Sequence, residues 1–484
     1  MLESTNSDAT QTEVRTDATA EDGTGRLRPD KLGVFSVAFF VVAAAAPVAA
    51  IVGAGPVIFA AVGPATPLVY AITALLIALF AVGYLRMSRY ITNAGGFVAY
   101  IAKGLGRSWA TAGAGIAVLT YLSLQIGLWS QFGVFAGELL KTLTGLDVPP
   151  IVLILVLLAA ATALTMGGID ASVRVLGILI LGETAVVSVL VGSLIVKHGW
   201  GIFTFAGFTS ANLFGPGLGI AVLFAFLCFT CFEATVVFSE EAVNPRKTIP
   251  RALYLVIAFV GLFFTVSTWA IGGAVGIDAV QQTATQDPAG FIFDLASASG
   301  GDTLSMSLQV LVVTSYLAML LGLTNMFSRY LFALGRAGVL PTPLAKVSRK
   351  GVPAKAGLYN GIVIAAVVSA FLFAGTDPLA VFAWFSALGT GAFITILLVT
   401  SAAVIAFFIR LPEKTGMWAT RIAPALSIAV FAYIGYLTFD NYDALLGAGN
   451  GAAEWLLVLI PVVIVAGILL GRAKPQIDYS AEII

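Results

Sequence analysis

Two acidic residues stand inside apolar stretches of this sequence, where a carboxyl group is unusual. Glu183 lies in the run Ser172–Val196, and Glu233 lies in the run Leu218–Phe238. A carboxyl group in hydrocarbon costs free energy and marks a candidate functional position, such as one that holds a proton or a cation. The structural alternatives are one interhelical hydrogen bond for Glu183 and the capping of a helix end for Glu233.

The other reactive side chains form no catalytic or metal-binding pattern. Cys228 and Cys231 form a C-x-x-C, but no second cysteine pair or nearby histidine completes a zinc or redox site. The single histidine, His198, flanks Lys197 and Trp200 and is expected at a solvated interface. Because no cluster of His, Asp or Ser accompanies them, the sequence predicts no enzyme, no metal site and no cofactor.

The composition around these positions indicates a membrane protein. Of the 484 residues, 59% are hydrophobic and 10% are charged, whereas a soluble domain is about 45–50% apolar and ~25% charged. A water-soluble protein of this composition could not cover its surface with polar groups. The formal net charge is zero, so nothing indicates a nucleic-acid partner.

Twelve apolar segments meet or approach the length that crosses a bilayer as a helix. A hydrocarbon core of ~30 Å needs about 20 helical residues, and backbone polar groups in lipid must be paired within the segment. A closed barrel would show alternating segments of about ten residues, which are absent. The segments are Leu32–Ala61, Leu68–Leu85, Ala110–Leu140, Ile151–Met166, Ser172–Val196, Leu218–Phe238, Ala252–Val275, Leu304–Phe327, Ala356–Ala374, Leu379–Phe408, Ile422–Phe439 and Ala452–Leu470.

Twelve crossings place both ends of the chain on the same side of the membrane. With the N-terminus in the cytoplasm, 23 of the 25 Lys and Arg residues lie inside, and only Lys141 and Lys197 lie outside. Because lysine and arginine concentrate in cytoplasmic loops, we predict this orientation. Residues 1–31 are expected to form a disordered cytoplasmic tail, and residues 473–484 a second, short polar tail.

Helices 1 and 6 are expected to be interrupted. Helix 1 contains four alanines followed by Pro47, and Ala45 lies ~20 Å from Leu32, near the middle of the membrane. Gly53-Ala54-Gly55 would lie ~31 Å away, at the outer surface, so the break is placed at Ala45–Pro47. Helix 6 contains the polar interruption Phe229-Thr230-Cys231-Phe232-Glu233. Broken helices in corresponding positions of two halves point to a transporter's binding site, although a simple proline kink would also explain helix 1.

Three stretches, in order and at matching topological positions, resemble the amino acid–polyamine–organocation transporters. They are NAGGFVAY at Asn93–Tyr100, the segment from Phe232-Glu233 to EEAVNPRKTIPR at Glu240–Arg251, and the segment from Ser328-Arg329-Tyr330 to Pro341. The resemblance departs at the helix 1 break, where an alanine run replaces the family's Gly-x-Gly. It also departs at Cys231, which stands where the family usually has a glycine.

The resemblance implies an all-α integral membrane fold of twelve helices. Residues 32–408 would form a leucine-transporter-like core of two inverted five-helix repeats, about 32–196 and 218–408, and residues 409–472 would add helices 11 and 12. It also implies alternating access around a site between helices 1, 3, 6, 8 and 10. The substrate carboxylate would meet N–H groups at the helix 1 break and its amine would meet carbonyls at the helix 6 break, as the partial charges of helix ends allow.

The predicted substrate-binding residues combine the two breaks with polar and aromatic side chains of helices 3, 8 and 10. Tyr121 and Gln125 share a helix face, so they could line the pocket or bind helices together. Trp384 could form an outer lid or belong to the aromatic belt at the lipid interface. The predicted residues are Ala44, Ala45, Ala46, Pro47, Tyr121, Gln125, Phe229, Thr230, Cys231, Phe232, Tyr316 and Trp384.

The predicted coupling or gating residues are Glu183, Glu233, Thr324 and Asn325. Glu183 lies ~16 Å along helix 5, where many members of the resembled family carry a lysine whose ammonium occupies a sodium site between helices 1, 5 and 8. A carboxyl group cannot replace that cation, but it could hold a proton or ligate a cation. Thr324 and Asn325 could supply oxygens to a cation or hydrogen-bond between helices.

The sequence therefore predicts a plasma-membrane permease that carries an amino acid or a related small amine and is coupled to protons. Sodium coupling, exchange and a polyamine substrate remain alternatives, although a polyamine usually needs several acidic groups in the membrane. A channel or receptor is the alternative from another class, and nothing in the sequence looks like a selectivity filter. The oligomeric state stays open.

Overall fold

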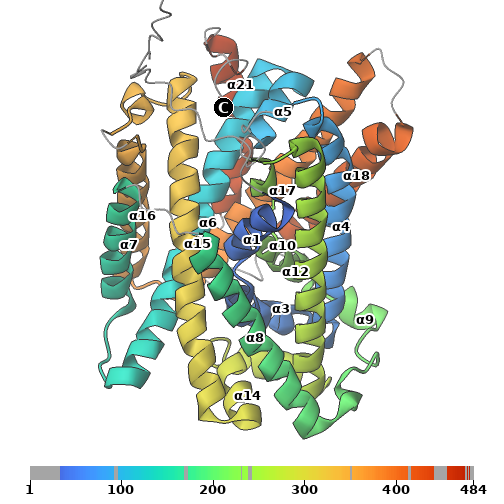
Figure 1. Ribbon diagram of the computed structural model, residues 1–484, viewed down its shortest axis with the longest axis vertical. Coiled ribbons are helices and arrows are strands. Elements are labelled where there is room, and N and C mark those ends of the chain that lie inside the picture. Colours follow the sequence, from blue (N-terminus) through green and yellow to red (C-terminus); the bar gives the residue numbers. More distant parts are fainter. Residues whose placement is uncertain are drawn as a thin grey trace, which may run out of the picture.

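The computed structural model describes residues 33–91, 96–167, 173–230, 232–237, 242–348, 351–411, 416–440, 455–474, 477 and 479. These residues form a bundle of helices in which long helices run roughly along its longest axis (Figure 1). The predicted tail 1–31 and the residue Cys231 lie outside the described part of the chain. For Ala44 only the backbone is described.

The first half of the chain follows the predicted segments closely. Its elements are α1 (Val34–Ala45), α2 (Pro47–Ala49), the π-helix η1 (Ala50–Ala54), α3 (Gly55–Val62), the 3₁₀ turn η2 (Gly63–Ala65), α4 (Thr66–Ser88), α5 (Gly96–Leu105), α6 (Arg107–Thr144), α7 (Pro150–Met166), α8 (Val173–His198), η3 (Trp200–Ile202) and α9 (Ser210–Leu213).

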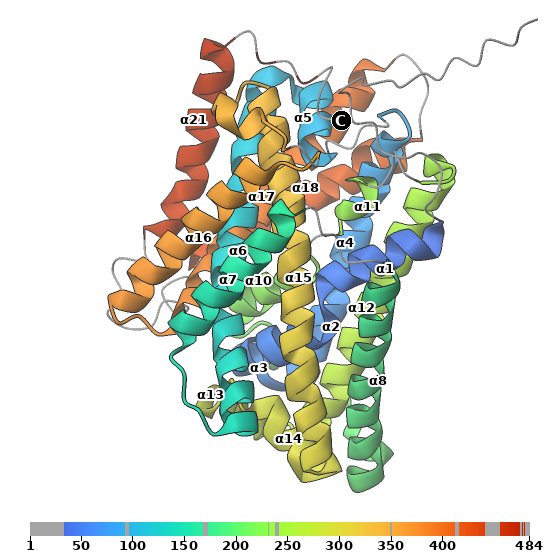
Figure 2. The same ribbon diagram turned by 60° about the vertical axis from the view of Figure 1, so that its left-hand side comes forward.

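The second half begins at helix 6. Its elements are α10 (Leu218–Cys228), α11 (Ala234–Val237), α12 (Pro245–Val275), α13 (Val280–Gln286), α14 (Phe291–Gly300), α15 (Asp302–Arg336), η5 (Thr342–Ala345), α16 (Ala354–Phe373), α17 (Pro378–Arg410), η6 (Trp418–Ile422), α18 (Ala423–Asp440), η7 (Leu456–Val458) and α21 (Leu459–Ala473). The short helices α13 and α14 lie at one end of the bundle and α5 lies at the other (Figure 2).

Within the described residues, nine helices are long and apolar enough to cross a membrane. One of them, Pro47–Ser88, joins the part of helix 1 that follows the break to helix 2 through a turn at Gly63, which has φ 52° and ψ −127°. Two shorter apolar helices, α7 and α10, stand where helices 4 and 6 are predicted. The protein is therefore a multi-pass membrane protein, while the count of twelve crossings stays a prediction.

Helix 1 is broken at the predicted place. Helix α1 ends at Ala45, and Pro47 begins α2. Between them Ala46 adopts a left-handed conformation, with φ 44° and ψ 70°. Such a conformation costs an alanine roughly 1–2 kcal/mol, so the surrounding packing must hold it in place. The Gly53-Ala54-Gly55 stretch lies at the π-helix η1 and the start of α3, past the break.

Helix 6 is also broken at the predicted place, because α10 ends at Cys228 and α11 begins at Ala234. Helices α3 and α10 lie between the long helices α6 and α12 (Figure 1). The two discontinuities are therefore both inside the bundle.

Helix 3 (α6) is the element against which much of the bundle packs, including α17, α15 and α21. Glycines allow the close approach of α6 to α17: a Cβ on Gly127 would lie 2.7 Å from Ser386 Oγ, and one on Gly389 would lie 2.8 Å from Leu124 Cδ2. Small residues at helix crossings provide such packing in membranes, where the hydrophobic effect does not drive helix association. The position of helix 10 relative to helix 3 is thereby fixed.

Candidate functional site

A cavity of about 30 Å³ lies where the two broken helices meet. This volume holds roughly two water molecules. Five helices line it, and they are the predicted set 1, 3, 6, 8 and 10. The lining consists of Ala45, Ala49, Ala50, Ala54, Leu128, Gln131, Leu227, Cys228, Thr230, Tyr316, Met319, Leu323 and Phe382.

Three of the predicted substrate-binding residues, Ala45, Thr230 and Tyr316, line this cavity. Ala46 and Pro47 are buried at the break beside it. The cavity wall is mostly aliphatic and aromatic, and it contains no charged side chain among the residues that the structure describes. Its polar groups are an amide, two hydroxyls and a thiol. A neutral, largely apolar group is therefore the one that fits this wall.

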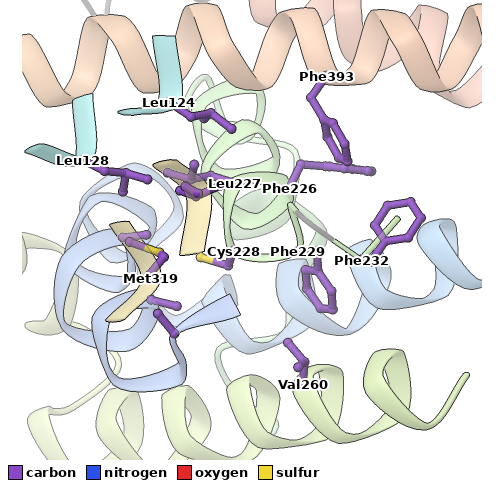
Figure 3. Close-up of a cluster of buried hydrophobic side chains, with 14 of the residues drawn as sticks. Leu124, Leu128, Phe226, Leu227, Cys228, Phe229, Phe232, Val260, Met319 and Phe393 are labelled. Atoms are coloured by element: carbon purple, nitrogen blue, oxygen red, sulfur yellow. The ribbon is translucent and has the colours of Figure 1, made fainter. Parts of the chain in front are cut away.

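Phe229 and Phe232 lie in the apolar core instead of the cavity wall. The Phe229 ring packs on Phe264 with centroids 5.9 Å apart, and the Phe232 ring packs on Phe80 at 5.8 Å and on Phe393 at 5.9 Å. In Figure 3 the cavity-lining residues Leu227, Cys228 and Met319 gather on one side, while the phenylalanines fill the other. The two rings therefore pack the helix 6 break against neighbouring helices on the side away from the cavity.

Tyr121 and Gln125 share a helix face, as predicted, and both bind neighbouring helices. The Tyr121 hydroxyl donates a hydrogen bond to Glu233 Oε1 at the helix 6 break. Gln125 Oε1 accepts hydrogen bonds from Asn360 Nδ2 at 2.9 Å and from Thr324 Oγ1 at 3.2 Å. This network joins helices 3, 6, 8 and 9. Its contacts agree with the alternative that Gln125 and Thr324 hold helices together by hydrogen bonds.

Two further predicted residues lie away from the cavity wall. Trp384 is buried, and its ring packs on Phe371 of α16 at 6.1 Å. Burial between helices excludes the alternative that Trp384 belongs to a lipid-facing aromatic belt. Asn325 is half-buried on α15, beside Thr324.

Gln131 was not predicted from the sequence and lies in the cavity wall beside Gly53. Its Nε2 donates to the Gly53 carbonyl at 3.0 Å, and its Oε1 accepts a hydrogen bond from the Tyr316 hydroxyl. A Cβ on Gly53 would overlap that hydroxyl and lie 2.9 Å from Gln131 Oε1. Gly53 is therefore required for helices 1, 3 and 8 to approach one another here. The sequence signal was an amide inside an apolar helix, next to Ser130.

Glu183 lies where helices 1, 5 and 8 meet. Its Oε2 accepts a hydrogen bond from the backbone N–H of Val48 at 3.3 Å, and Glu183 is 4% exposed. Helix α8, which carries Glu183, packs on α1, α2 and α15. Val48 is the second residue of α2, so the carboxyl group faces the N-terminal end of a half-helix, where the backbone favours an anion.

No group of three or more His, Cys, Asp or Glu side chains that could hold a metal ion occurs within the described residues. A salt bridge between Lys141 and Asp147, at 3.7 Å, lies at the end of helix 3, past the cavity-lining residue Gln131. The chemistry of the site thus consists of hydrogen bonding and apolar packing at two helix breaks.

Taken together, the apolar helices and the two interrupted ones define a membrane transport protein with a leucine-transporter-like fold. The family model for amino acid permeases matches residues 36–473, and the chain belongs to this family, which is part of the amino acid–polyamine–organocation superfamily. The family is one of transporters.

Three comparisons illustrate the relationship. The branched-chain amino acid permease BcaP of Lactococcus lactis subsp. cremoris is 28% identical over 330 residues, which cover 64% of this chain and 69% of BcaP. A probable polyamine transporter of Arabidopsis thaliana is 30% identical over 122 residues, which cover 25% of this chain and 24% of that protein. A crystal structure of MhsT in complex with L-phenylalanine is 14% identical, with a TM-score of 0.59 over 90% of this chain and 100% of MhsT.

Proposed function

We propose that this chain is a secondary active transporter for a neutral amino acid with a small apolar side chain. The observation that carries the proposal is a cavity bordered by both breaks, through Ala45 on one side and Thr230 on the other. N–H groups at the start of a half-helix suit a carboxylate, and carbonyls at the end of one suit an ammonium group. The apolar remainder of the wall suits an uncharged side chain, as the similarity to a branched-chain permease also suggests.

A cavity of about 30 Å³ is smaller than any amino acid, so binding requires the wall to open. The bond between Tyr121 and Glu233 ties helix 3 to the segment that precedes α11. We call this bond the inner gate. In an alternating-access cycle it would have to break before the inner half of helix 6 could move away from helix 3.

Coupling to protons through Glu183 fits the position of this carboxyl group. When it is ionised, it is a good acceptor for the Val48 N–H and stabilises the start of α2. When it is protonated, it loses the negative charge that favours this arrangement. Protonation at Glu183 would therefore change the stability of the helix 1 break, beside the cavity. The Thr324 hydroxyl donates its proton to Gln125 and keeps its oxygen lone pairs, so sodium coupling through this residue is the alternative that a sodium gradient tests.

The proposed location is the plasma membrane, with both ends of the chain in the cytoplasm. The charge distribution supports this orientation, since 23 of the 25 Lys and Arg residues then lie inside. A polyamine is not supported as a substrate, because no carboxylate lines the cavity in the described part of the chain and a dication would need one.

Thermal unfolding of the purified protein tests the substrate class directly. Leucine, isoleucine, valine and alanine at millimolar concentration should raise the unfolding temperature by mass action, whereas lysine, glutamate and putrescine should not. Stabilisation by lysine or putrescine, with none by the apolar amino acids, would contradict the proposed substrate class. Stabilisation by no amino acid at all would contradict the proposed function.

A further inference from the structure

The connection from helix 5 to helix 6, residues 199–217, contains no Asp, Glu, Lys, Arg or His. We call it the 5–6 connection. The connection that carries α13 and α14 is different, because it contains Asp278, Asp287 and Asp294. Charged residues are the ones that usually cover the water-exposed surface of a protein. The composition of the 5–6 connection is therefore not that of a solvated loop.

The 5–6 connection presents aromatic side chains at its surface instead. Trp200 is 75% exposed, Phe205 is 70% exposed and Phe214 is 67% exposed. The Phe205 ring packs on the Trp269 ring of α12, with centroids 4.8 Å apart. Trp269 Nε1 donates a hydrogen bond to the Thr204 carbonyl at 2.8 Å. The connection is therefore fixed to helix 7 by specific contacts while its largest rings stay uncovered by protein.

The exposed rings continue the apolar surface of two membrane helices. On α12, the exposed residues Leu262 and Val266 lie on the helix face that ends at Trp269. On α8, the exposed residues Val189 and Val196 lead to the start of the connection. Membrane-spanning helices turn such apolar side chains towards lipid, so the connection begins at the edge of a lipid-facing surface. Figure 1 shows α9, within the connection, at the periphery of the bundle.

The same connection packs on the end of the part of helix 1 that follows the break. A Cβ on Gly207 would lie 2.5 Å from Pro64 Cβ, and one on Gly217 would overlap the Ala61 carbonyl. Ala61 lies in α3 and Pro64 in the turn η2 that follows it. Because no larger side chain fits at either glycine, the backbone of the connection lies directly against the end of α3. Helix α3 follows η1, whose residue Ala54 lines the cavity.

We propose that the 5–6 connection lies in the boundary between the headgroups and acyl chains of the adjacent lipid leaflet and anchors the end of α3 there. Trp200, Phe205 and Phe214 are the inserted side chains. Aromatic rings concentrate at this boundary, where the ring meets acyl chains and an indole N–H can still meet polar groups. Insertion desolvates no ion, because the connection carries none. Phospholipid is the partner, since the exposed rings are continuous with the lipid-facing residues of α8 and α12.

Fluorescence quenching of the full-length protein, in nanodiscs that hold one copy each, locates Trp200. The chain has seven tryptophans, so the emission of Trp200 is taken as the difference between the wild type and Trp200→Phe. Phosphatidylcholine brominated near the headgroup should quench this emission more strongly than the same lipid brominated near the chain ends. Acrylamide in the water should quench it little. The difference between the wild type and Trp129→Phe is the matched control, because Trp129 is buried and should be shielded from all three quenchers.

Three outcomes would overturn the anchor. Quenching of Trp200 by acrylamide, without quenching by brominated lipid, would place the connection in water. Shielding from all three quenchers would mean that other parts of the chain cover the ring. Lipid quenching that disappears in discs loaded with two copies would mean that a second copy of the chain, and not lipid, is the partner.

Hydrogen–deuterium exchange of the peptide that covers residues 56–65, in the same nanodiscs, tests whether the anchor holds the end of α3. The double variant Trp200→Ser/Phe205→Ser replaces two exposed rings with polar side chains and should raise the exchange rate there at least about fivefold. Phe373→Ser is the matched control, because Phe373 is an exposed ring at the end of α16. Exchange in the double variant that stays at the level of Phe373→Ser would contradict the anchoring of α3. Neither experiment requires transport, so failure of the anchor is separable from failure of the proposed function.

Discussion

Replacing Gly53 with alanine should disturb the contact between helices 3 and 8 and the part of helix 1 that follows the break. The added Cβ would overlap the Tyr316 hydroxyl, so this hydroxyl must move and lose its bond to Gln131. The lost hydrogen bond is worth about 1 kcal/mol, and an extra methyl group in a packed interior costs ~1–3 kcal/mol. The variant should therefore be destabilised by about 2–4 kcal/mol.

Because the displaced groups line the cavity, substrate affinity should fall at least about tenfold, which corresponds to 1.4 kcal/mol. Thermal unfolding and leucine binding on the purified protein measure both effects. Gly55→Ala is the matched control, since its Cβ would meet only the Ala50 carbonyl, at 3.9 Å. It should leave affinity unchanged.

A second substitution tests whether the Tyr316 hydroxyl is the cause of the effect. Tyr316→Phe removes the hydroxyl that a Cβ on Gly53 would overlap, so the double variant Gly53→Ala/Tyr316→Phe should recover part of the lost stability and affinity. A Gly53→Ala variant that behaves like Gly55→Ala would contradict the predicted clash with the Tyr316 hydroxyl. A double variant that is no more stable and binds no better than Gly53→Ala alone would contradict it as well.

Three further outcomes are expected. Ala46→Gly should stabilise the protein by up to about 1 kcal/mol in thermal unfolding, because glycine tolerates the left-handed conformation at φ 44°. Ala46→Leu should instead abolish leucine binding while the protein stays folded. Met319→Ala should shift the binding preference from leucine towards phenylalanine in competition binding, because it enlarges the cavity, and should cost about 2 kcal/mol of stability. An unchanged preference would count against this cavity as the substrate site. A cysteine at Thr144 should react with an impermeant thiol reagent applied to intact cells and one at Ser348 should not, whereas the reverse pattern would invert the topology.

The breaks in helices 1 and 6 could be predicted from the sequence because their causes are local. Pro47 has no N–H to continue the helix, and Glu233 is a carboxyl group that hydrocarbon does not tolerate without a partner. The break at Ala46 survives without glycine because tertiary packing holds the strained conformation. Local features such as a proline or a carboxyl group therefore predict where a helix breaks, but they do not predict the backbone conformation at the break.

The roles of the side chains around the breaks were harder to predict, because the packing of neighbouring helices decides which way each side chain points. Phe229 and Phe232 flank the helix 6 break but pack away from the cavity. Gln125 and Gln131 are both amides on helix 3, yet only Gln131 reaches the cavity wall. Nothing in the local sequence separates the two, since their partners come from helices 1, 8 and 9.

The place of Glu183 at the meeting of helices 1, 5 and 8 was expected from the resemblance to known transporters. Its bond to the Val48 N–H could not be expected, because it depends on where the helix 1 break exposes a donor. In the structure, this carboxyl group in an apolar helix thus contacts a specific backbone donor at the helix 1 break. The role of that contact in coupling is the part of the account that a transport measurement must decide.

That measurement is the accumulation of leucine in liposomes under an imposed proton gradient, with an imposed sodium gradient at constant pH for comparison. The wild-type protein should concentrate leucine under the proton gradient alone. Glu183→Gln, which keeps the shape of the side chain but cannot ionise, should still bind and exchange leucine without concentrating it. A wild-type protein that accumulates no neutral amino acid under either gradient, or a Glu183→Gln variant that accumulates leucine as well as the wild type, would contradict the account.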